Sequence, residues 1–481
     1  MAQASVQAII LAAGKSRRFK TDTSKLVYPL CGQKLILYPI KLLSSLAIPT
    51  TVIVGHQKEL VTAAVQSLNA QTITNRTIDF IEQKEQKGTG HALAITQELW
   101  HADHILVMNG DMPLVDQQLI QEIIDKHVRT NATVTFVTAY QPDPTMGGYG
   151  RVIREGTSIK IVEARDCSQE LRAESLINAG IYLFKREFLQ KTCPTLTFHE
   201  NSQEFYLTDL IAQANLQQQP LQTITVPFDS IRGVNTLKEL WICDHIKRSE
   251  LISSWMEQGV QFTAPQTISV DLGVSLGAGT TVGTSVRLAG ATAIGNHCSI
   301  GDGCHIENST IADNVIIHPH SIIKNATINA HAAVGPFAHV KERSTIGEHA
   351  VIGNFVEVVR SCVGEKTKIK HLSYIGDAVI GNRVNVGAGT VICNYDGHAK
   401  HQTIIKNDVF IGSNNSLIAP LTIGQGAMTA AGSTITDNVP EDALAIARAR
   451  QVTKEGYAAL KRGQHAFVGA QRDKSTIHEN S

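Results

Sequence analysis

A glycine loop followed by basic side chains is the first segment of this 481-residue chain that could perform chemistry. Residues 11–25 read LAAGKSRRFKTDTSK, so that Gly14 is followed by Lys15, Arg17, Arg18 and Lys20. A strand that turns at glycine exposes successive backbone N–H groups, and such groups beside positive charges suit a triphosphate. The segment lacks GxxxxGK[ST], which excludes a P-loop. Taken alone, the pattern is explained more often by a solvated loop.

An acidic turn, Asn109-Gly110-Asp111, is the second such segment and follows the apolar run 105–108 (ILVM). Ligands of open α/β sheets bind beyond the carboxyl ends of the strands. Both this turn and residues 14–25 fall at such a strand end. Asp111 alone could equally be a turn residue that caps the next helix.

The elements that must position these residues alternate between strand and helix. Apolar runs predict strands and amphipathic patterns predict helices, in the order strand 6–12, helix 34–46, strand 50–55, helix 59–68, strand 78–82, helix 91–99 and strand 105–108. This alternation implies a mostly parallel, doubly wound α/β sheet, which is Rossmann-like. A mixed apolar stretch at 237–258, with Trp241 and Trp255, predicts a packed connecting helix.

The second half of the chain has a period of six residues. An aliphatic side chain stands at every sixth position at Leu276, Val282, Leu288, Ile294, Ile300 and Ile306, and a small residue follows several of them. A period of six fits neither an α-helix nor a lone strand. It predicts a parallel β-helix of hexapeptide repeats, in which each aliphatic residue points into a narrow prism. The rhythm slips by one residue near Ile311 and continues beyond it, so the solenoid takes more than a third of the chain.

The composition indicates which binding partners are not expected and in which cellular compartment the protein should be found. The 43 basic and 43 acidic residues cancel, which argues against nucleic acid or an anionic membrane as a partner. The chain has no run of 18 apolar residues, and its N-terminus reads apolar and then basic, the reverse of a secretory signal. Eight cysteines form no CxxC pair, as expected for core thiols in a reducing compartment. We expect a cytoplasmic protein.

Further motifs follow the glycine loop in a fixed order. They are Gln83 with Gly88-Thr89-Gly90-His91-Ala92, Asn109-Gly110-Asp111 with Pro113-Leu114, Gly148-Tyr149-Gly150-Arg151, Glu163, Asn178-Ala179-Gly180 and Gly233-Val234-Asn235. In this order, and with the β-helix, the chain resembles over nearly its whole length the bifunctional UDP-N-acetylglucosamine pyrophosphorylase / glucosamine-1-phosphate N-acetyltransferase family (the GlmU family). The resemblance implies a uridylyltransferase domain at 1–236, a connecting helix at 237–258, a left-handed β-helix acetyltransferase domain at 259–452 and a tail at 453–481. The polar end, 472–481, is expected to be disordered.

The resemblance also implies a UTP site in the first domain. Asp111 and Asn235 would hold a Mg²⁺ ion, and Lys25 and Arg18 would neutralise phosphates. Gln83, Gly88 and Thr89 would bind uracil, while Gly150, Glu163 and Asn178 would bind the N-acetylglucosamine ring. The same resemblance places Leu11, Ala12, Ala13, Gly14 and Asn109 in this site.

In the second domain the segment Lys370-His371-Leu372-Ser373-Tyr374 matches the family's catalytic stretch. His371 would be the general base for attack of the glucosamine amine on acetyl-CoA. Lys341, Tyr374 and Asn385 would contact the sugar phosphate. The acetyl-CoA groove would be lined by Ala388, Asn394, Tyr395, Ser413, Ala431 and Arg448. The prism of such proteins implies a homotrimer, with each site at a subunit seam.

The chain departs from the family pattern in both domains. Ser16 and Arg17 replace a glycine and a threonine in the loop, and Ser24 replaces the proline before the phosphate-binding lysine. Lys341 replaces an arginine, and Val359 replaces a second basic residue that grips the sugar phosphate, although Arg360 follows directly. Neighbours face opposite ways on a strand, so we do not expect Arg360 to reach the phosphate.

Two alternatives stay open at this point. In one, only the nucleotidyl half is active and the β-helix is a trimerisation and regulatory scaffold, which Lys341 and Val359 favour and His371, Asn394, Tyr395 and Arg448 oppose. In the other, the nucleotidyl half uses another nucleotide or sugar, although Gln83 with Gly88 and Thr89 favours UTP.

Overall fold

The chain forms two compact units, residues 1–309 and 310–481. The computed structural model describes residues 5–68, 78–143, 148–156 and 158–464, so the predicted disordered end at 472–481 lies outside the described residues. No helix within these ranges has the length and apolar character needed to cross a membrane. The predicted domain limits, the cytoplasmic location and the exclusion of a nucleic-acid partner stay predictions.

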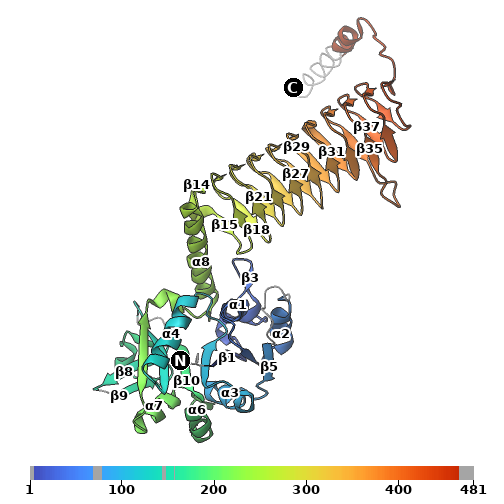
Figure 1. Cartoon of the computed structure of the whole chain (residues 1–481). Coiled ribbons are helices and arrows are strands. Elements are labelled where there is room, and N and C mark those ends of the chain that lie inside the picture. The colour runs from blue at the N-terminus through green and yellow to red at the C-terminus, as the bar shows by residue number, and fades with distance from the viewer. Residues whose placement is uncertain (1–4, 69–77, 144–147, 157, 465–481) are drawn as a thin grey trace, which may run out of the picture. The chain divides into compact units, whose positions relative to one another are not determined.

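The first unit is built on a mixed sheet whose strands run in the order β13-β7-β10-β6-β1-β4-β5. Figure 1 labels β1, β5 and β10 of this sheet. The antiparallel member is β10, and a hairpin of β8 and β9 pairs with it. The bounds are β1 (Val6–Ala12), β4 (Thr50–Val54), β5 (Ile78–Glu82), β6 (His104–Asn109), β7 (Val134–Tyr140), β8 (Arg151–Glu155), β9 (Ser158–Val162), β10 (Leu176–Lys185) and β13 (Leu221–Val226). The first unit also contains two separate short hairpins. One pairs β2 (Pro29–Leu30) with β3 (Gln33–Lys34), and the other pairs β11 (Phe198–His199) with β12 (Glu204–Phe205).

Helices cover both faces of this sheet, because alternate residues of each buried strand point to opposite sides. Ile10 of β1 packs in the core that contains α1 (Leu37–Ser45), α2 (Lys58–Gln66) and α4 (Gln117–Arg129). Ile9 packs in the core that contains α3 (Thr89–Ala94), α6 (Arg186–Thr192) and α7 (Asp209–Leu216). The remaining helices are the short α5 (Gln169–Arg172) and the long α8 (Leu237–Glu257). The predicted doubly wound, Rossmann-like domain is confirmed.

Strand register brings the loops of the site to one edge of the sheet. The central strands β1, β4, β5 and β6 are parallel, with Leu11 beside Asn109, Ala12 beside Val54, and Val54 beside Glu82. The segments that begin at Gly14, Gln83 and Asn109 therefore leave neighbouring strands at the same level.

The β-helix consists of two- to three-residue strands that pair in parallel with the strand one turn later. In the first unit Val282 of β17 pairs with Ile300 of β20, and Leu288 of β18 pairs with Ile306 of β21, an offset of three hexapeptides. The strands here are β14 (Gln261–Phe262), β15 (Ser269–Val270), β16 (Ser275–Leu276), β17 (Thr281–Val282), β18 (Arg287–Ala289), β19 (Ala293–Ile294), β20 (Ser299–Ile300) and β21 (His305–Glu307).

The second unit continues the same pattern. Its strands are β22 (Thr310–Ile311), β23 (Ile316–Ile317), β24 (Ile322–Lys324), β25 (Thr327–Ile328), β26 (Ala333–Val334), β27 (His339–Lys341), β28 (Thr345–Ile346), β29 (Val351–Val359), β30 (Cys362–Val363), β31 (Lys368–Gly376), β32 (Ala378–Ile380), β33 (Asn385–Val386), β34 (Val391–Cys393), β35 (Thr403–Ile405), β36 (Phe410–Ile411), β37 (Ser416–Ile418), β38 (Leu421–Ile423), β39 (Met428–Thr429), β40 (Thr434–Ile435) and β41 (Leu444–Ala445). The aliphatic residues of the six-residue rhythm are buried in both units, which confirms the hexapeptide β-helix.

Two predicted elements differ from the observed ones. Helix α1 begins at Leu37 rather than at residue 34, because Lys34 pairs with Pro29 in the β2–β3 hairpin. Helix α3 ends at Ala94, and a separate 3₁₀ turn follows at Gln97–Leu99. The coil ends with the short strand β41, in which Leu444 pairs with Met428 of β39.

Candidate active sites

A single ammonium group lies between the two predicted metal ligands. The Lys25 side chain forms an ion pair with the Asp111 carboxylate, and its Nζ donates to Asn235 Oδ1 at 2.8 Å. Segments far apart in the sequence, the loop after β1, the turn after β6 and the start of α8, thus meet at one point. Because a carboxylate and an amide oxygen converge on one cation, this pair can bind a small hard cation.

Local backbone contacts hold the two oxygen donors in place. The Val234 N–H donates to the Asp111 carbonyl at 2.9 Å, which ties the two turns together. Thr236 is the N-cap of α8 and accepts from the Glu239 N–H, while the Glu239 carboxylate accepts from the Asn235 N–H at 2.8 Å. This reciprocal cap satisfies donors at the helix start and fixes Asn235 at the same time.

The neighbouring Gly233 extends this framework. Its N–H donates to the Tyr149 hydroxyl at 3.0 Å, and burial raises the pKa of that hydroxyl. A Cβ on Gly233 would lie 3.6 Å from Asp111 Oδ1. The Gly-Val-Asn segment therefore runs directly alongside the acidic turn.

The glycine loop approaches the same point. Gly14 is exposed, and a Cβ there would meet nothing within 4 Å, so the backbone has open space in front of it. Ser16 has φ = 53°, in the left-handed region that glycine adopts without cost, and its Oγ accepts from the Lys25 N–H at 3.3 Å. The replacement of the family glycine thus falls at a position whose backbone favours glycine. The exposed Arg18 guanidinium lies against Gly148, where a Cβ would be 2.6 Å from it.

The predicted uracil segment is held by its own side chains. Gln83 is buried, and its Nε2 donates to the Gly88 carbonyl at 3.1 Å and contacts His91 Nδ1 at 3.0 Å. Gly88 has φ = 95°, and a Cβ there would lie 2.5 Å from the Phe205 carbonyl oxygen, so glycine is required. Thr89 Oγ1 accepts from the Leu207 N–H at 3.2 Å.

The predicted sugar-binding residues form a third group. The Asn178 N–H donates to the Gly150 carbonyl at 2.9 Å, and a Cβ on Gly150 would lie 3.7 Å from Glu163 Oε2. Glu163 accepts from the Thr208 hydroxyl at 2.8 Å, and burial raises its pKa. These three residues are therefore neighbours, although 28 positions separate Gly150 from Asn178.

The remaining predicted residues of the first domain lie at the ends of β1 and β6. Leu11 and Ala12 end β1, Leu11 is paired with Asn109, and Ala13 follows directly. A Cβ on Gly180 would lie 2.6 Å from the Asn109 side chain. The structure thus gathers the loop, the acidic turn and the Asn235 segment at one sheet edge.

In the second unit, His371 is exposed on β31 rather than buried in the interior of the coil. Its Nδ1 contacts Asn354 Oδ1 at 2.9 Å, and the two residues are register neighbours on β31 and β29. With the amide oxygen accepting from Nδ1–H, the ring proton lies on Nδ1 and Nε2 keeps its lone pair. This is the arrangement that a general base needs.

The basic residue that is predicted to contact the sugar phosphate, Lys341, is paired within the chain. Lys341 contacts Glu357 at 2.7 Å. Val359 lies between Lys341 and Gly376 in the ladder and is buried. Arg360 pairs with Asp377 through Nε at 2.6 Å and also with Glu342.

The ion pair between Arg360 and Asp377 also shifts the pKa of both side chains. The hydrogen bonds that the Arg360 guanidinium donates to Asp377 raise the pKa of the guanidinium and lower the pKa of the Asp377 carboxyl. That Arg360 does not reach the sugar phosphate stays a prediction. The Arg360 guanidinium is neutralised by two carboxylates.

The loop after β34 is joined to this network. The buried Asn394 donates from Nδ2 to Asp377, and a Cβ on Gly376 would meet both Asn394 and the Tyr374 hydroxyl within 2.7 Å. Tyr395 is exposed, and its hydroxyl donates to the Gly397 carbonyl at 2.7 Å. Tyr374, Asn394 and Tyr395 therefore form one group with the Lys341 ladder.

A second group lies at the corner that follows β33, β36 and β39 on successive turns. The Asn414 N–H donates to the Ala388 carbonyl at 2.7 Å, and the Gly432 N–H donates to the Ser413 carbonyl at 2.8 Å. Ala388, Ser413 and Ala431 consequently follow one another on successive turns, and Arg448 Cδ lies 3.8 Å from the Cβ position of Gly432. Asn385 stands at the start of this segment, paired in register with Lys368 of β31.

The two groups are joined through β31. Lys368, at the start of β31, pairs in register with Asn385, and Tyr374, near its end, pairs with Val391. His371 lies between them, and the Gly389 N–H donates to the carbonyl of the next residue, Leu372, at 3.0 Å. The predicted acetyl-site residues therefore lie on neighbouring turns of one chain.

Sequence reasoning missed Asn354 and Glu357. Each is a neighbour of a predicted residue on the next or previous turn, 16 or 17 residues away. The six-residue rhythm contains the signal, since a turn is about three hexapeptides, but the slipped register near the site hides which residues pair.

Comparisons with known proteins place this architecture. The model of the MobA-like NTP transferase domain matches residues 8–177, and that of the GMPPB C-terminal domain matches residues 270–345 and 324–425. Among solved structures, the inositol-1-phosphate CTP transferase from T. maritima gives a TM-score of 0.37 with 13% identity, over 49% of this chain and 91% of that chain. That likeness is too slight to bear on function. The fold and the first site define an NTP transferase joined to a hexapeptide β-helix.

Full-length relatives identify the family. The bifunctional protein GlmU of Thermotoga maritima is 38% identical over 95% of this chain and 99% of its own length. The one from Streptococcus pyogenes serotype M3 is 41% identical over 94% of this chain and 97% of its own length. The chain belongs to the GlmU family. It is a bifunctional enzyme, a uridylyltransferase and an acetyltransferase, so the interpretation of the β-helix as a mere scaffold is wrong.

Ser16 offers a direct test of the loop geometry. We expect Ser16→Gly to be more stable than Ser16→Ala by about 0.5–1 kcal/mol, because alanine keeps the left-handed strain, whose relief in glycine exceeds glycine's extra unfolded-state entropy. Urea unfolding followed by tryptophan fluorescence measures the difference, since Trp100, Trp241 and Trp255 all lie in the first unit. Equal stability of the two variants would contradict the assigned backbone strain.

Proposed function

We propose that the chain makes UDP-N-acetylglucosamine in two steps. The second domain transfers acetyl from acetyl-CoA to glucosamine-1-phosphate, and the first transfers uridylyl from UTP to the N-acetylated product. The observation that carries the first half is the convergence of Asp111, Asn235 and Lys25 on one cation position. The observation that carries the second is the exposed His371 oriented by Asn354.

Mg²⁺ fits the first site. The Lys25 ammonium stands in for a cation between a carboxylate and an amide oxygen, and such hard donors suit Mg²⁺. Asp111 and Asn235 would hold the ion, which neutralises phosphate charge when bound.

The side chains around this point position two polyanions. In uridylyl transfer an oxygen of the sugar phosphate attacks the α-phosphorus of UTP, and the bond to the β-phosphate breaks to release pyrophosphate. Lys25 has a flexible stem, so its ammonium can leave Asp111 and Asn235 and pair with a phosphate. Arg18 supplies a further positive charge beside the glycine loop. The uracil ring would be bound by Gln83, Gly88 and Thr89. The sugar would be bound by Gly150, Glu163 and Asn178. Positioning and charge neutralisation provide most of the catalysis in such a reaction.

In acetyl transfer the chain supplies the base. The amine nitrogen of glucosamine-1-phosphate attacks the thioester carbonyl, a C–N bond forms, and the C–S bond breaks to release coenzyme A. His371 Nε2 accepts the amine proton, since Nδ1–H is held by Asn354. Lys341, Tyr374 and Asn385 would hold the sugar phosphate. Ala388, Asn394, Tyr395, Ser413, Ala431 and Arg448 would line the coenzyme groove.

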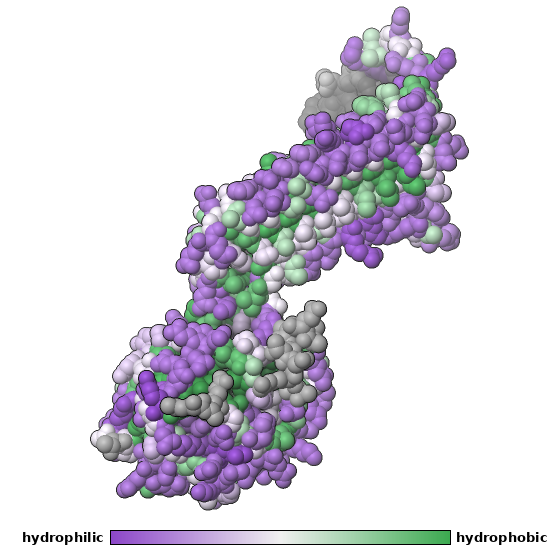
Figure 2. All heavy atoms as spheres, in the orientation of Figure 1, coloured by the Kyte–Doolittle hydropathy of each residue, from purple (hydrophilic) through white to green (hydrophobic). Residues whose placement is uncertain are grey.

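We further propose that the acetyltransferase is a homotrimer. His371 is exposed on the surface of the coil, where a second chain can complete the site around it. Exposed apolar residues support this assembly: Phe337 and Phe355 stack at 5.4 Å on successive turns, and Leu372, beside His371, follows. Figure 2 shows hydrophobic surface along the coil of the second unit. Such uncovered surface marks an interaction site.

A reciprocal pair of variants tests the two activities. Asp111→Asn should reduce Mg²⁺-dependent release of pyrophosphate from UTP by about a hundredfold or more, because it removes the charged ligand of the cation. His371→Asn should reduce release of free coenzyme A by about 10²–10⁴-fold, because it removes the base. Each variant should retain the other activity, which serves as its folding control. Unchanged pyrophosphate release in Asp111→Asn would remove this residue from the metal site.

Val359→Lys tests the missing phosphate contact. Val340, Val358 and Ile375 form the buried interior column, so the neighbouring column of Lys341, Val359 and Gly376 lies on the outward side and a lysine at 359 can reach solvent. We expect the KM for glucosamine-1-phosphate to fall at least about tenfold, since a charge-assisted hydrogen bond contributes about 1.5–3 kcal/mol.

Val359→Met is the matched control for Val359→Lys, because it adds length without charge. If both variants leave KM unchanged, the charge that binds the phosphate is supplied elsewhere.

Sedimentation velocity tests the assembly. The 52.1 kDa chain should sediment with the mass of three copies. Phe355→Asp combined with Leu372→Asp should shift the mass toward one copy. The double variant places charges within the exposed apolar row of Phe337, Phe355 and Leu372. Leu60→Asp, at an exposed leucine of α2, should leave the mass unchanged. A monomeric wild-type chain would contradict the proposal.

A further inference from the structure

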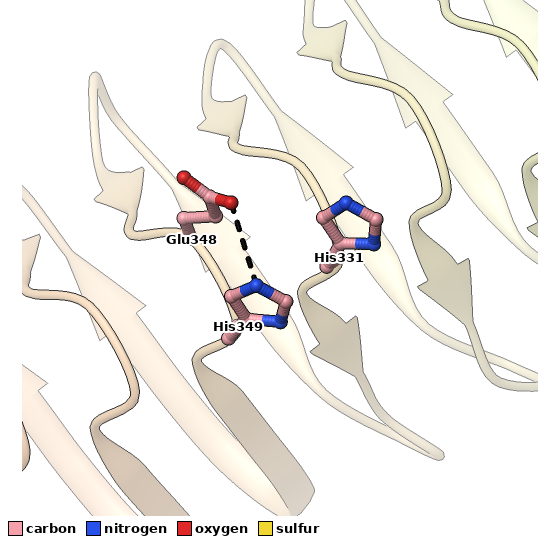
Figure 3. A group of neighbouring side chains, drawn as sticks. All are labelled: His331, Glu348 and His349. Atoms are coloured by element: carbon pink, nitrogen blue, oxygen red, sulfur yellow. Dashed lines mark ion pairs between the residues drawn. The ribbon is translucent and has the colours of Figure 1, made fainter.

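A group of three side chains outside both active sites has the composition of a metal centre. The ligand atoms of His331, Glu348 and His349 all lie within 4.8 Å of one another (Figure 3). The two imidazole rings are stacked with centroids 4.7 Å apart and planes at 8°, and the Glu348 carboxylate lies 3.4 Å from His349 Nε2. All three residues are exposed.

The coil geometry explains why the two histidines meet. His331 and His349 occupy the same corner on successive turns, with φ of 60° and 55°, and the His349 N–H donates to the Ala330 carbonyl at 3.1 Å. Adjacent strands lie about 4.8 Å apart, so side chains at equivalent corner positions stand directly above one another. Glu348 is next to His349 in sequence, and its carboxylate turns toward the same side as both rings in Figure 3.

Backbone conformation alone does not account for the group. Histidine tolerates the left-handed region better than most residues. His320 shows this at another corner, where φ is 59° and the ring stacks on Phe337 at 5.2 Å. What distinguishes the His331 corner is a second imidazole and a carboxylate, so that three side chains place ligand atoms within 4.8 Å of one another.

We infer that His331, Glu348 and His349 bind one Zn²⁺ ion, or a transition-metal ion of similar chemistry. Two imidazole nitrogens and one carboxylate oxygen are donors that Zn²⁺ takes at about 2.0–2.2 Å, and such donors around one tetrahedral ion lie about 3.4 Å apart. Glu348 and His349 already have this spacing. The exposed ring of His331 closes the site by turning about its side-chain torsions. A fourth coordination position stays open to water, whereas Mg²⁺ and Ca²⁺ would require oxygen donors throughout.

The ion would connect two turns of the coil. His331 lies on one turn, and Glu348 and His349 lie on the next. The turn after that is tied to the site by the backbone, where the Lys366 N–H donates to the Glu348 carbonyl at 2.9 Å. Because the unfolded chain lacks this arrangement, bound metal raises the melting temperature of the folded state.

Zinc titration of the full chain by calorimetry tests the site. The protein is stripped with EDTA and then kept in excess Mg²⁺, so that the oxygen site at Asp111 is satisfied. His331→Asn and His349→Asn retain a residue that tolerates the corner conformation. Each should bind one zinc fewer per chain than the wild type, and each should lose the zinc-dependent rise in melting temperature. Glu348→Gln should bind at this site at least about tenfold more weakly.

His320→Asn is the matched control, since it makes the same replacement at a left-handed corner that has no carboxylate in the group. It should keep the zinc stoichiometry of the wild type. Equal zinc binding by the wild type, His331→Asn and His349→Asn, or no zinc binding by the wild type, would overturn the inference. Both activities can be measured in the same samples, so this outcome is independent of the proposed function.

Discussion

Hydrogen bonding between successive turns of the β-helix is the constraint on which the second half of this enzyme depends. It fixes residues 17 or 18 positions apart in register. Functional groups are therefore built from residues that stack on successive turns, not from residues that are adjacent in the sequence. Asn354 orients His371 in this way, and Asp377 holds Arg360 in this way. A column also stacks His331 on His349. One repeated backbone contact therefore builds a base, an ion-pair network and a candidate metal centre.

The first half uses a different principle, in which parallel strands end at one level and their loops converge. Asp111 follows β6 and the Lys25 loop follows β1, while Asn235 is supplied from the start of α8. The reciprocal cap of Thr236 and Glu239 makes the beginning of that helix part of the site. Stability and function are thus coupled, because any change that weakens the cap also releases a cation ligand.

The sequence predicts the fold well because both folds are strongly periodic. Buried aliphatic residues at every sixth position leave no other regular structure open, and β1 and β5 end where the apolar runs end. Helix α1 is predicted less well, since a local hairpin at Lys34 overrides its amphipathic pattern. The role of a single residue such as Asp111 could be predicted only from the order of the surrounding motifs along the chain. Asn354 and Glu357 could not be predicted, because pairing between turns depends on a register that slips.

Phe337, Phe355 and Leu372 adopt left-handed backbone conformations on successive turns, and Gly389 takes the same corner on the turn after. Glycine is the relaxed choice there, whereas each bulky residue costs on the order of 1–2 kcal/mol. An isolated chain is consequently less stable than the same coil with glycine corners. The exposed apolar side chains beside His371 therefore lower the stability of the folded chain. Such a cost is expected to persist where the side chains have a function in the folded protein.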